Sequence, residues 1–99
     1  MDRVEVETYS QDVNNSVVRT PGRKFPALVI QGDSFSTLFI MARSVFDRAK
    51  ACQSEDSELL DEAEELCDQL WSRLHHYEET LHANGFALPY NRISRQPRG

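Results

Sequence analysis

The stretch that decides the fold is residues 21–34, PGRKFPALVIQGDS. It contains, in order, a Pro-Gly turn signal, an apolar run over 27–30 and a Gly-Asp-Ser sequence. An apolar helix pattern over 35–49 follows directly. The run 27–30 has the composition of a strand. The glycine allows the chain to turn, and Asp33 or Ser34 can cap the helix that follows. These residues predict a strand that leads into a capped helix.

Two more strands are expected before this stretch. Apolar and charged residues alternate over 3–7, which is typical of a half-buried strand, and residues 17–20, Val-Val-Arg-Thr, are expected to form a second short strand. Asn14-Asn15 suits a hairpin turn between them, because asparagine tolerates the left-handed conformation. With 27–30, the segments predict a three-stranded antiparallel meander.

A second, longer helix is expected from a cap at Ser54 or Asp56 to a C-cap at Asn84-Gly85. About 28 residues at roughly 1.5 Å each would make a rod of about 40 Å that overhangs a small sheet. Its apolar residues keep four-and-three spacing, which is typical of a helix-packing seam. The seam residues are Leu60, Ala63, Cys67, Leu70, Leu74, Tyr77 and Leu81. We expect a homodimer to form through Leu70, Trp71, Leu74 and Tyr77.

The predicted fold class is therefore α+β, with the order β-β-β-α-α. Ninety-nine residues suit a single domain, which we place at 1–91. An apolar segment over 86–90 is a candidate for a short C-terminal edge strand, limited by its proline. Residues 92–99 carry three arginines and no acid, and we expect a disordered basic tail there.

Charge is segregated along the chain. The net charge is −5, and residues 55–68 hold eight of the 16 acidic residues but none of the 11 Lys and Arg. Such a run is commonly a solvated helix face, although it can also receive a basic partner. The candidate partner-binding residues are Glu58, Asp61, Glu62, Glu65 and Asp68. The acidic balance argues against direct binding of nucleic acid or of an anionic membrane.

A basic cluster, Arg19, Arg23 and Lys24, falls between the second and third expected strands. The adjacent prolines and glycine stiffen this loop, so that it could present the cluster to a phosphate or an acidic partner. An ordinary charged loop is the alternative.

Catalytic and metal-binding patterns are missing from the sequence. The three histidines lie within 75–82, the four glycines are scattered, and no nucleophile elbow or phosphate loop is present. Pairs such as Glu78 and His82 are better explained as helix contacts than as zinc ligands. We expect no enzyme activity, no cofactor and no metal. Two cysteines, with no signal peptide and no long apolar run, favour a cytoplasmic protein.

The sequence from Phe25 to Phe35, followed by Leu38 and Ala42, resembles the core of HicB-type antitoxins. The shared features are a strand that ends in Gln-Gly-Asp-Ser and a helix that carries an apolar residue, followed by a leucine and then by an alanine. The resemblance implies a partial ribonuclease H-like fold without catalytic acids, which neutralises a toxin by binding it. Small uncharacterised bacterial proteins also resemble this segment. The family's Pro-Gly-Cys is not reproduced, and no DNA-binding motif follows.

The functional hypothesis is a small acidic protein-binding module. It would act as a stoichiometric inhibitor of the antitoxin, immunity or phage anti-defence kind, with the acidic helix against a basic, nuclease-like surface. The alternatives are a homodimeric structural or adaptor protein and a sensor of a small ligand.

Overall fold

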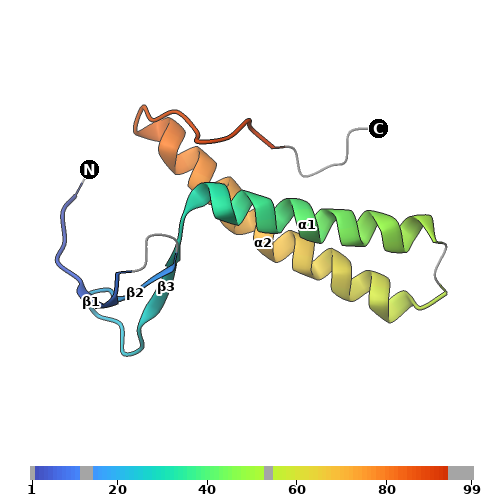
Figure 1. The fold of residues 1–99 in the computed structure, drawn as a ribbon, viewed down its shortest axis with the longest axis horizontal. Helices are drawn as coiled ribbons and strands as arrows, with labels where there is room; N and C mark the ends of the chain where they lie inside the picture. The colour runs from blue at the N-terminus through green and yellow to red at the C-terminus, as the bar shows by residue number, and fades with distance from the viewer. Residues whose placement is uncertain (1, 12–14, 53–54, 94–99) are drawn as a thin grey trace.

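The computed structural model describes residues 2–11, 15–52 and 55–93, and it has the predicted β-β-β-α-α order (Figure 1). The strands are β1 (Glu7–Ser10), β2 (Asn15–Arg19) and β3 (Ala27–Ile30), and the helices are α1 (Gly32–Ala51) and α2 (Ser57–Ala83). The sheet order is β1-β2-β3, and both strand pairs are antiparallel. The three-stranded meander and the long second helix are confirmed.

The first strand differs from its prediction. Of the alternating residues 3–7, only Glu7 lies in β1, and all four residues of β1 are exposed. The period-two pattern predicts a strand with one buried face, but no other element of the described chain covers this part of the sheet. The turn residue Asn14 lies outside the described residues, and Asn15 already belongs to β2.

A tight turn over residues 20–23 begins the link between β2 and β3. The Arg23 amide donates to the Thr20 carbonyl at 3.2 Å, and Gly22 has a φ of 79°. Proline at the second position and a positive-φ glycine at the third are typical of a type II turn. The Pro-Gly signal therefore sets the chain reversal that brings β3 beside β2.

Helix α1 begins earlier than predicted. Its N-cap is Gln31, without a side-chain cap, so Asp33 and Ser34 lie inside the first turn. Gly32 packs so closely against the Tyr77 ring that a Cβ at this position would overlap the ring carbons. This close approach fixes where α1 meets α2. The Asp33 carboxylate still favours the positive end of the helix dipole.

Helix α2 begins at the predicted cap Asp56 and ends at the predicted Asn84-Gly85, whereas the alternative cap Ser54 lies outside the described residues. The Leu59 amide donates to Asp56 Oδ1 at 3.0 Å. At the other end, the Gly85 amide donates to the His82 carbonyl and the Phe86 amide to the Leu81 carbonyl, with Gly85 at a φ of 75°. This bond pair defines a Schellman motif, as the Asn-Gly signal predicts.

The two helices form an antiparallel hairpin, and the core lies between them. The buried apolar residues are Phe39, Ala42, Cys67 and Leu74. The rings of Phe39 and Trp71 lie 5.4 Å apart, a distance typical of favourable aromatic pairs. The sheet lies at one end of the hairpin and does not form a layer beneath it (Figure 1).

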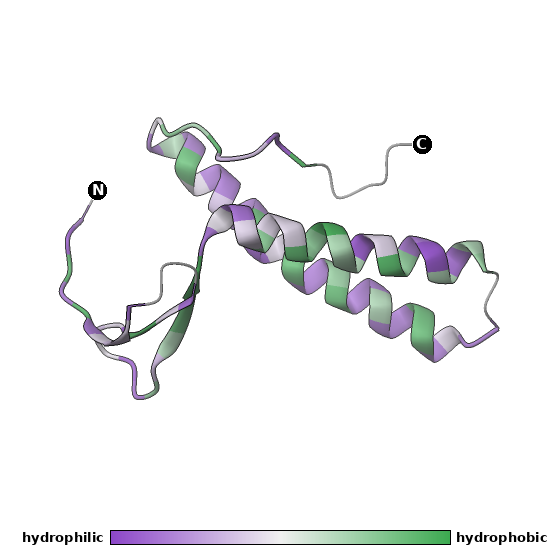
Figure 2. Ribbon diagram, in the orientation of Figure 1, coloured by the Kyte–Doolittle hydropathy of each residue, from purple (hydrophilic) through white to green (hydrophobic). Residues whose placement is uncertain are grey.

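The molecule is consequently elongated. Its extents are 49 × 31 × 21 Å, and its radius of gyration is 16.4 Å, whereas a compact chain of 100 residues has about 13 Å. Hydrophobic residues are visible along the hairpin and on β3 (Figure 2). Much of the apolar surface is thus left outside the core.

The C-terminal segment is not a strand. Residues 86–93 run back along the hairpin with irregular backbone, so the predicted edge strand over 86–90 is wrong. Proline at 89 removes a backbone donor, and side-chain bonds to α2 hold the segment instead. Arg92 belongs to this ordered segment, because it pairs with Glu78 and Glu79. The rest of the predicted tail, 94–99, lies outside the described residues.

Candidate functional site

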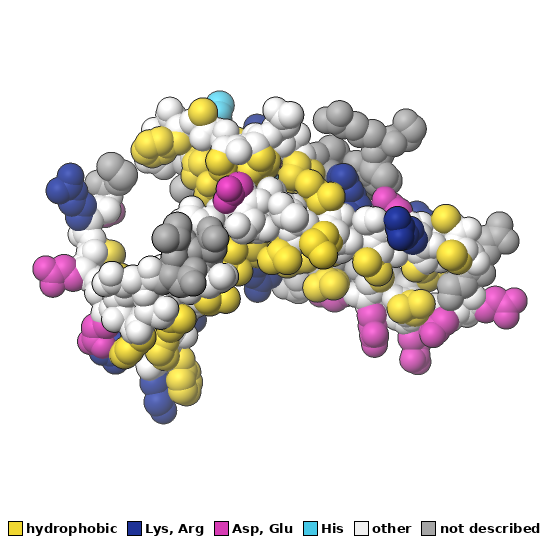
Figure 3. All heavy atoms as spheres, viewed as in Figure 1, with side chains coloured by type: hydrophobic (Ala, Val, Ile, Leu, Met, Phe, Trp, Pro, Cys, Tyr) yellow, Lys and Arg dark blue, Asp and Glu magenta, His cyan; other side chains and the backbone are white. Residues whose placement is uncertain are grey.

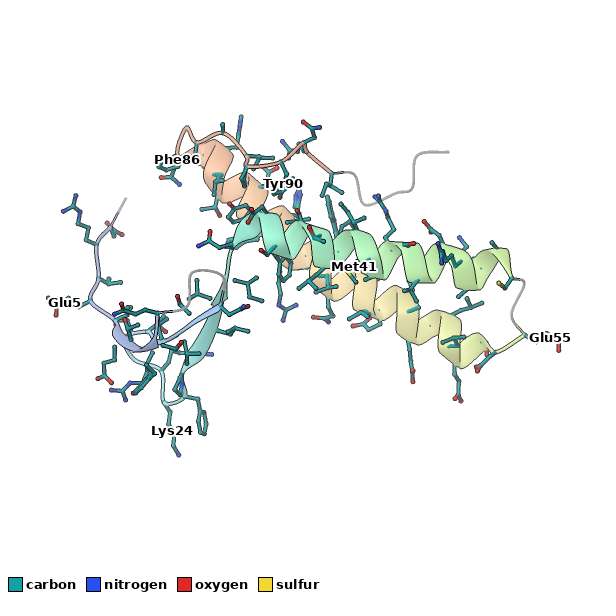
Figure 4. All side chains as sticks on the ribbon, in the orientation of Figure 1. Glu5, Lys24, Met41, Glu55, Phe86 and Tyr90 are labelled. Atoms are coloured by element: carbon teal, nitrogen blue, oxygen red, sulfur yellow. The ribbon has the colours of Figure 1, made fainter. Side chains whose placement is uncertain are left out.

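An apolar stripe runs along one side of the helical hairpin. Helix α1 contributes Leu38, Met41 and Val45, and α2 contributes Leu59 and Leu66; each is between 44% and 61% exposed. Helical spacing puts each set on one line, and the antiparallel packing turns both lines toward the same side. Figure 3 shows hydrophobic side chains along this face, and Figure 4 places Met41 on it. We call these five residues the hairpin stripe.

The hairpin stripe leads toward a hollow at the sheet end of the molecule. This hollow has a volume of about 340 Å³, and Leu28 and Ile30 of β3 face Phe35, Leu74 and Tyr77 across it. Arg73 supplies a charged group to its lining. The stripe and the hollow together form a run of exposed apolar side chains, and contiguous apolar patches commonly mark interaction sites.

Acidic residues border the hairpin stripe on α2. Glu58, Glu62 and Glu65 are exposed and follow i, i+4, i+7 spacing, so that they form one row beside Leu66. In the described ranges, no ion pair or hydrogen bond involves the side chains of Glu58 or Glu62. Glu65 accepts a hydrogen bond from Gln69 at 2.9 Å. Figure 3 shows acidic side chains on this side of α2.

The other two predicted acids lie elsewhere on α2. Asp61 and Asp68 are seven residues apart, on a line turned away from the hairpin stripe, and Asp68 is half-buried. The five predicted acids are thus not one surface. The helical spacing of these acids already separates them into two rows. Which row borders the hairpin stripe depends on which side of α2 faces the core, and only the structure shows that side.

The basic cluster is also divided. The Arg19 guanidinium pairs with the Glu7 carboxylate, which accepts a second hydrogen bond, from Tyr9. The pKa of Glu7 is lowered by the hydrogen bond from the Arg19 guanidinium, by the hydrogen bond from the Tyr9 hydroxyl and by the positive charge of Arg19. Lys24 lies at the tip of the β2–β3 turn (Figure 4), with Nζ 5.4 Å from the centroid of Phe25. Arg19 is therefore engaged within the sheet, while Arg23 and Lys24 are exposed.

The residues assigned to a dimer seam instead build the hairpin of a single chain. Leu74 is fully buried, Trp71 packs on Phe39, and Tyr77 packs on Gly32. Leu70 is half-buried. Helix α1 of the same chain packs on the apolar seam of α2, so Leu74 has no exposed surface that a second copy could contact.

A buried carboxylate, Glu78, is a feature that sequence reasoning missed. It is 1% exposed, and its Oε2 accepts a hydrogen bond from the Tyr90 hydroxyl at 2.9 Å. Arg92 Nε lies 3.7 Å from Glu78 Oε1, which has no hydrogen-bond partner within the described residues. Burial, then the hydrogen bond to Glu78 and its charge, raise the pKa of Tyr90 well above its usual value. These contacts fasten the C-terminal segment to α2.

Cys67 is buried and Cys52 is exposed, and both are free thiols. Within 2–11, 15–52 and 55–93, no group of three His, Cys, Asp or Glu residues is placed to hold a metal ion. Over the same ranges, neither helix has the length and apolar character that crossing a membrane requires.

Fold and surface together define a class: an elongated α+β protein in which a small sheet carries a helical hairpin with an apolar, acid-bordered face. The sequence model of a family of unknown function, DUF6959, matches residues 1–90, and the chain belongs to this family. No match was found among the curated proteins or among the solved structures.

Proposed function

We propose that the protein is a small acidic protein-binding module that inhibits a partner protein by stoichiometric binding. The hairpin stripe supplies the apolar centre of the contact, and Glu58, Glu62 and Glu65 supply its charged border. A partner with a basic surface, such as a nuclease, fits this chemistry. Inhibitors of the antitoxin, immunity or phage anti-defence kind would use such a surface.

The observation that carries the proposal is the combination of exposed apolar residues and exposed acids on one side of the hairpin. Interfaces commonly have an apolar centre and a polar border. Charges at the border mainly raise the association rate and select the partner. An acidic face that served solubility alone would not need five large apolar side chains beside it.

The resemblance of residues 25–42 to HicB-type antitoxins favours the inhibitor role over an adaptor role. A homodimeric adaptor remains the second candidate, because apolar surface is also exposed on the sheet. The hollow near Tyr77 is open and mainly apolar, which gives a small-ligand sensor less support than a protein partner.

The test is capture of a partner from a native bacterial lysate, followed by mass spectrometry and a binding assay with the purified partner. The test variant replaces Glu58, Glu62 and Glu65 with lysine. The matched control replaces Glu55, Asp61 and Glu64 with lysine, which gives the same change in net charge on the same acidic stretch.

The test variant should lose the partner, mainly because association becomes slower. The control variant should still bind it. Binding by the intact protein should weaken as salt is raised, because exposed charges are screened. Equal binding by both triple variants would refute the acidic border. Circular dichroism checks that α2 stays helical in each variant.

A further inference from the structure

The two edges of the sheet are protected very differently. Edge strand β1 has an irregular register between Thr8 and Ser10, and its Glu7 pairs with Arg19. Charges and bulges of this kind prevent unwanted strand pairing. Edge strand β3 reads Ala-Leu-Val-Ile, with no charge and no proline, and it pairs with β2 without a break. Its outer edge is open to another strand.

The side chains of β3 have little cover within the chain. Leu28 is 57% exposed and Val29 is 46% exposed, and strand alternation points them to opposite faces of the sheet. Three strands of four or five residues need a packed face or a covering helix for stability. Here the hairpin reaches the sheet beside the hollow lined by Leu28 and Ile30. The sheet therefore lacks the cover that its composition calls for.

We propose that a second copy of the chain pairs its β3 antiparallel with this edge, so that the two sheets become one. Identical antiparallel neighbours are related by a two-fold axis perpendicular to the sheet. Residues that lie opposite each other then belong to the same face. For this strand the two central registers are those in which Leu28 or Val29 lies opposite its own copy.

Charges beside β3 favour a second copy as the occupant. In both registers, the turn that carries Arg23 and Lys24 lies near the start of α1 in the other copy. Asp33 is exposed at that position. Basic and acidic groups thus meet at both ends of the joined strands, and β3 itself has no charge that would repel its copy.

The chain as a whole exposes more surface than a compact protein of its mass. The chain exposes 7925 Å², whereas a compact monomeric protein of 11.4 kDa exposes about 5,800 Å². A standard interface removes roughly 800 Å² from each partner. The hairpin stripe lies on α1 and α2 and not on β3. A dimer through β3 would leave it available, and this inference does not depend on the proposed function.

The experiment measures molar mass by light scattering from low to high micromolar concentration. The intact chain is expected at twice the 11.4 kDa of one copy. Val29→Lys puts a charge on the open edge and should give a monomer with unchanged helical circular dichroism. The control is Val45→Lys, the same change at a residue of the hairpin stripe, which should stay dimeric.

A monomer at high micromolar concentration refutes the inference. So does a dimer that survives Val29→Lys, or one that Val45→Lys dissociates while Val29→Lys does not. The two proposals can also fail separately, since a monomeric Val29→Lys variant that still captures the partner keeps the hairpin function.

A charge exchange tests the geometry if Val29→Lys does not fold. Lys24→Glu and Asp33→Lys, each alone, should weaken the dimer roughly fivefold, because two symmetric contacts are lost. The double variant should recover most of the affinity, since the pair is restored with its signs exchanged. Unchanged dissociation constants for both single variants would refute pairing through β3.

Discussion

Replacing Tyr90 with phenylalanine tests the buried carboxylate of α2. The described structure holds two tyrosine-to-glutamate hydrogen bonds of the same length: Tyr90 to Glu78 and Tyr9 to Glu7, both 2.9 Å. Glu78 is 1% exposed, whereas Glu7 and Tyr9 lie on the surface. The same chemical change should therefore have different effects at the two sites.

The expected loss at Tyr90 follows from burial. Without the hydroxyl, Glu78 keeps only Arg92 among the described residues, and the Arg92 Nε is too distant for a hydrogen bond at 3.7 Å. Hydrogen bonds to charged groups contribute roughly 1.5–3 kcal/mol, and the partial exposure of Tyr90 points to the lower half of this range. With a urea m-value of about 1.5 kcal/mol/M, a loss of about 2 kcal/mol lowers the unfolding midpoint by about 1.3 M.

The assay is urea unfolding, followed by the fluorescence of Trp71, the one tryptophan of the chain, and by circular dichroism. Tyr9→Phe is the matched control and should leave the midpoint unchanged, because water replaces the lost contact. Glu78→Leu combined with Tyr90→Phe should recover much of the loss, since apolar replacement of both partners is often neutral or stabilising.

An unchanged midpoint for Tyr90→Phe would refute the reasoning. Equal shifts for Tyr90→Phe and Tyr9→Phe would do the same, because burial would then make no difference. A loss in Tyr90→Phe that the double variant does not recover would mean that the hydroxyl stabilises the segment by some route other than Glu78.

Three further outcomes follow from the packing and the pKa shift. Leu74→Ala should cost about 2–5 kcal/mol in urea unfolding, because Leu74 is fully buried; Leu66→Ala, at a residue 54% exposed, should have a much smaller effect. Gly32→Ala should cost about 1–3 kcal/mol, because its Cβ would overlap the Tyr77 ring, and adding Tyr77→Ala should remove that cost. Stability should fall as the pH rises above about 10, where unfolded tyrosine loses its proton but folded Tyr90, with its raised pKa, retains it. Denaturation curves from pH 8 to 11 should show a shallower decline in Tyr90→Phe, and an identical slope would contradict the assigned shift.

Local signals predicted the elements well. The apolar run 27–30 coincides with β3, the Asp56 cap starts α2, and Asn84-Gly85 ends it. Each signal acts through backbone groups within a few residues, so the rest of the fold has little influence on it. The predicted cap at Asp33 or Ser34 is not formed, because α1 already begins at Gly32, which packs against the Tyr77 ring of α2.

The candidate surface was less predictable than the elements. The acidic run identified Glu58, Glu62 and Glu65 as candidates. It did not show that they lie on a different side of α2 from Asp61 and Asp68. The hairpin stripe could not be predicted, because Leu38 and Val45 belong to the apolar helix pattern over 35–49, which is equally typical of buried core residues. Which apolar residues stay exposed depends on the angle at which α1 meets α2.

The sequence alone determined that this chain forms three short strands, a helix and a long acidic helix, because periodicity, turns and caps are local properties. Tertiary structure alone decided what each apolar surface contacts. The seam around Leu74 could meet a second chain or the same chain, and the short link between α1 and α2 lets the chain close on itself. The same folding leaves β3 and the hairpin stripe exposed, and buries Glu78 where Tyr90 can reach it.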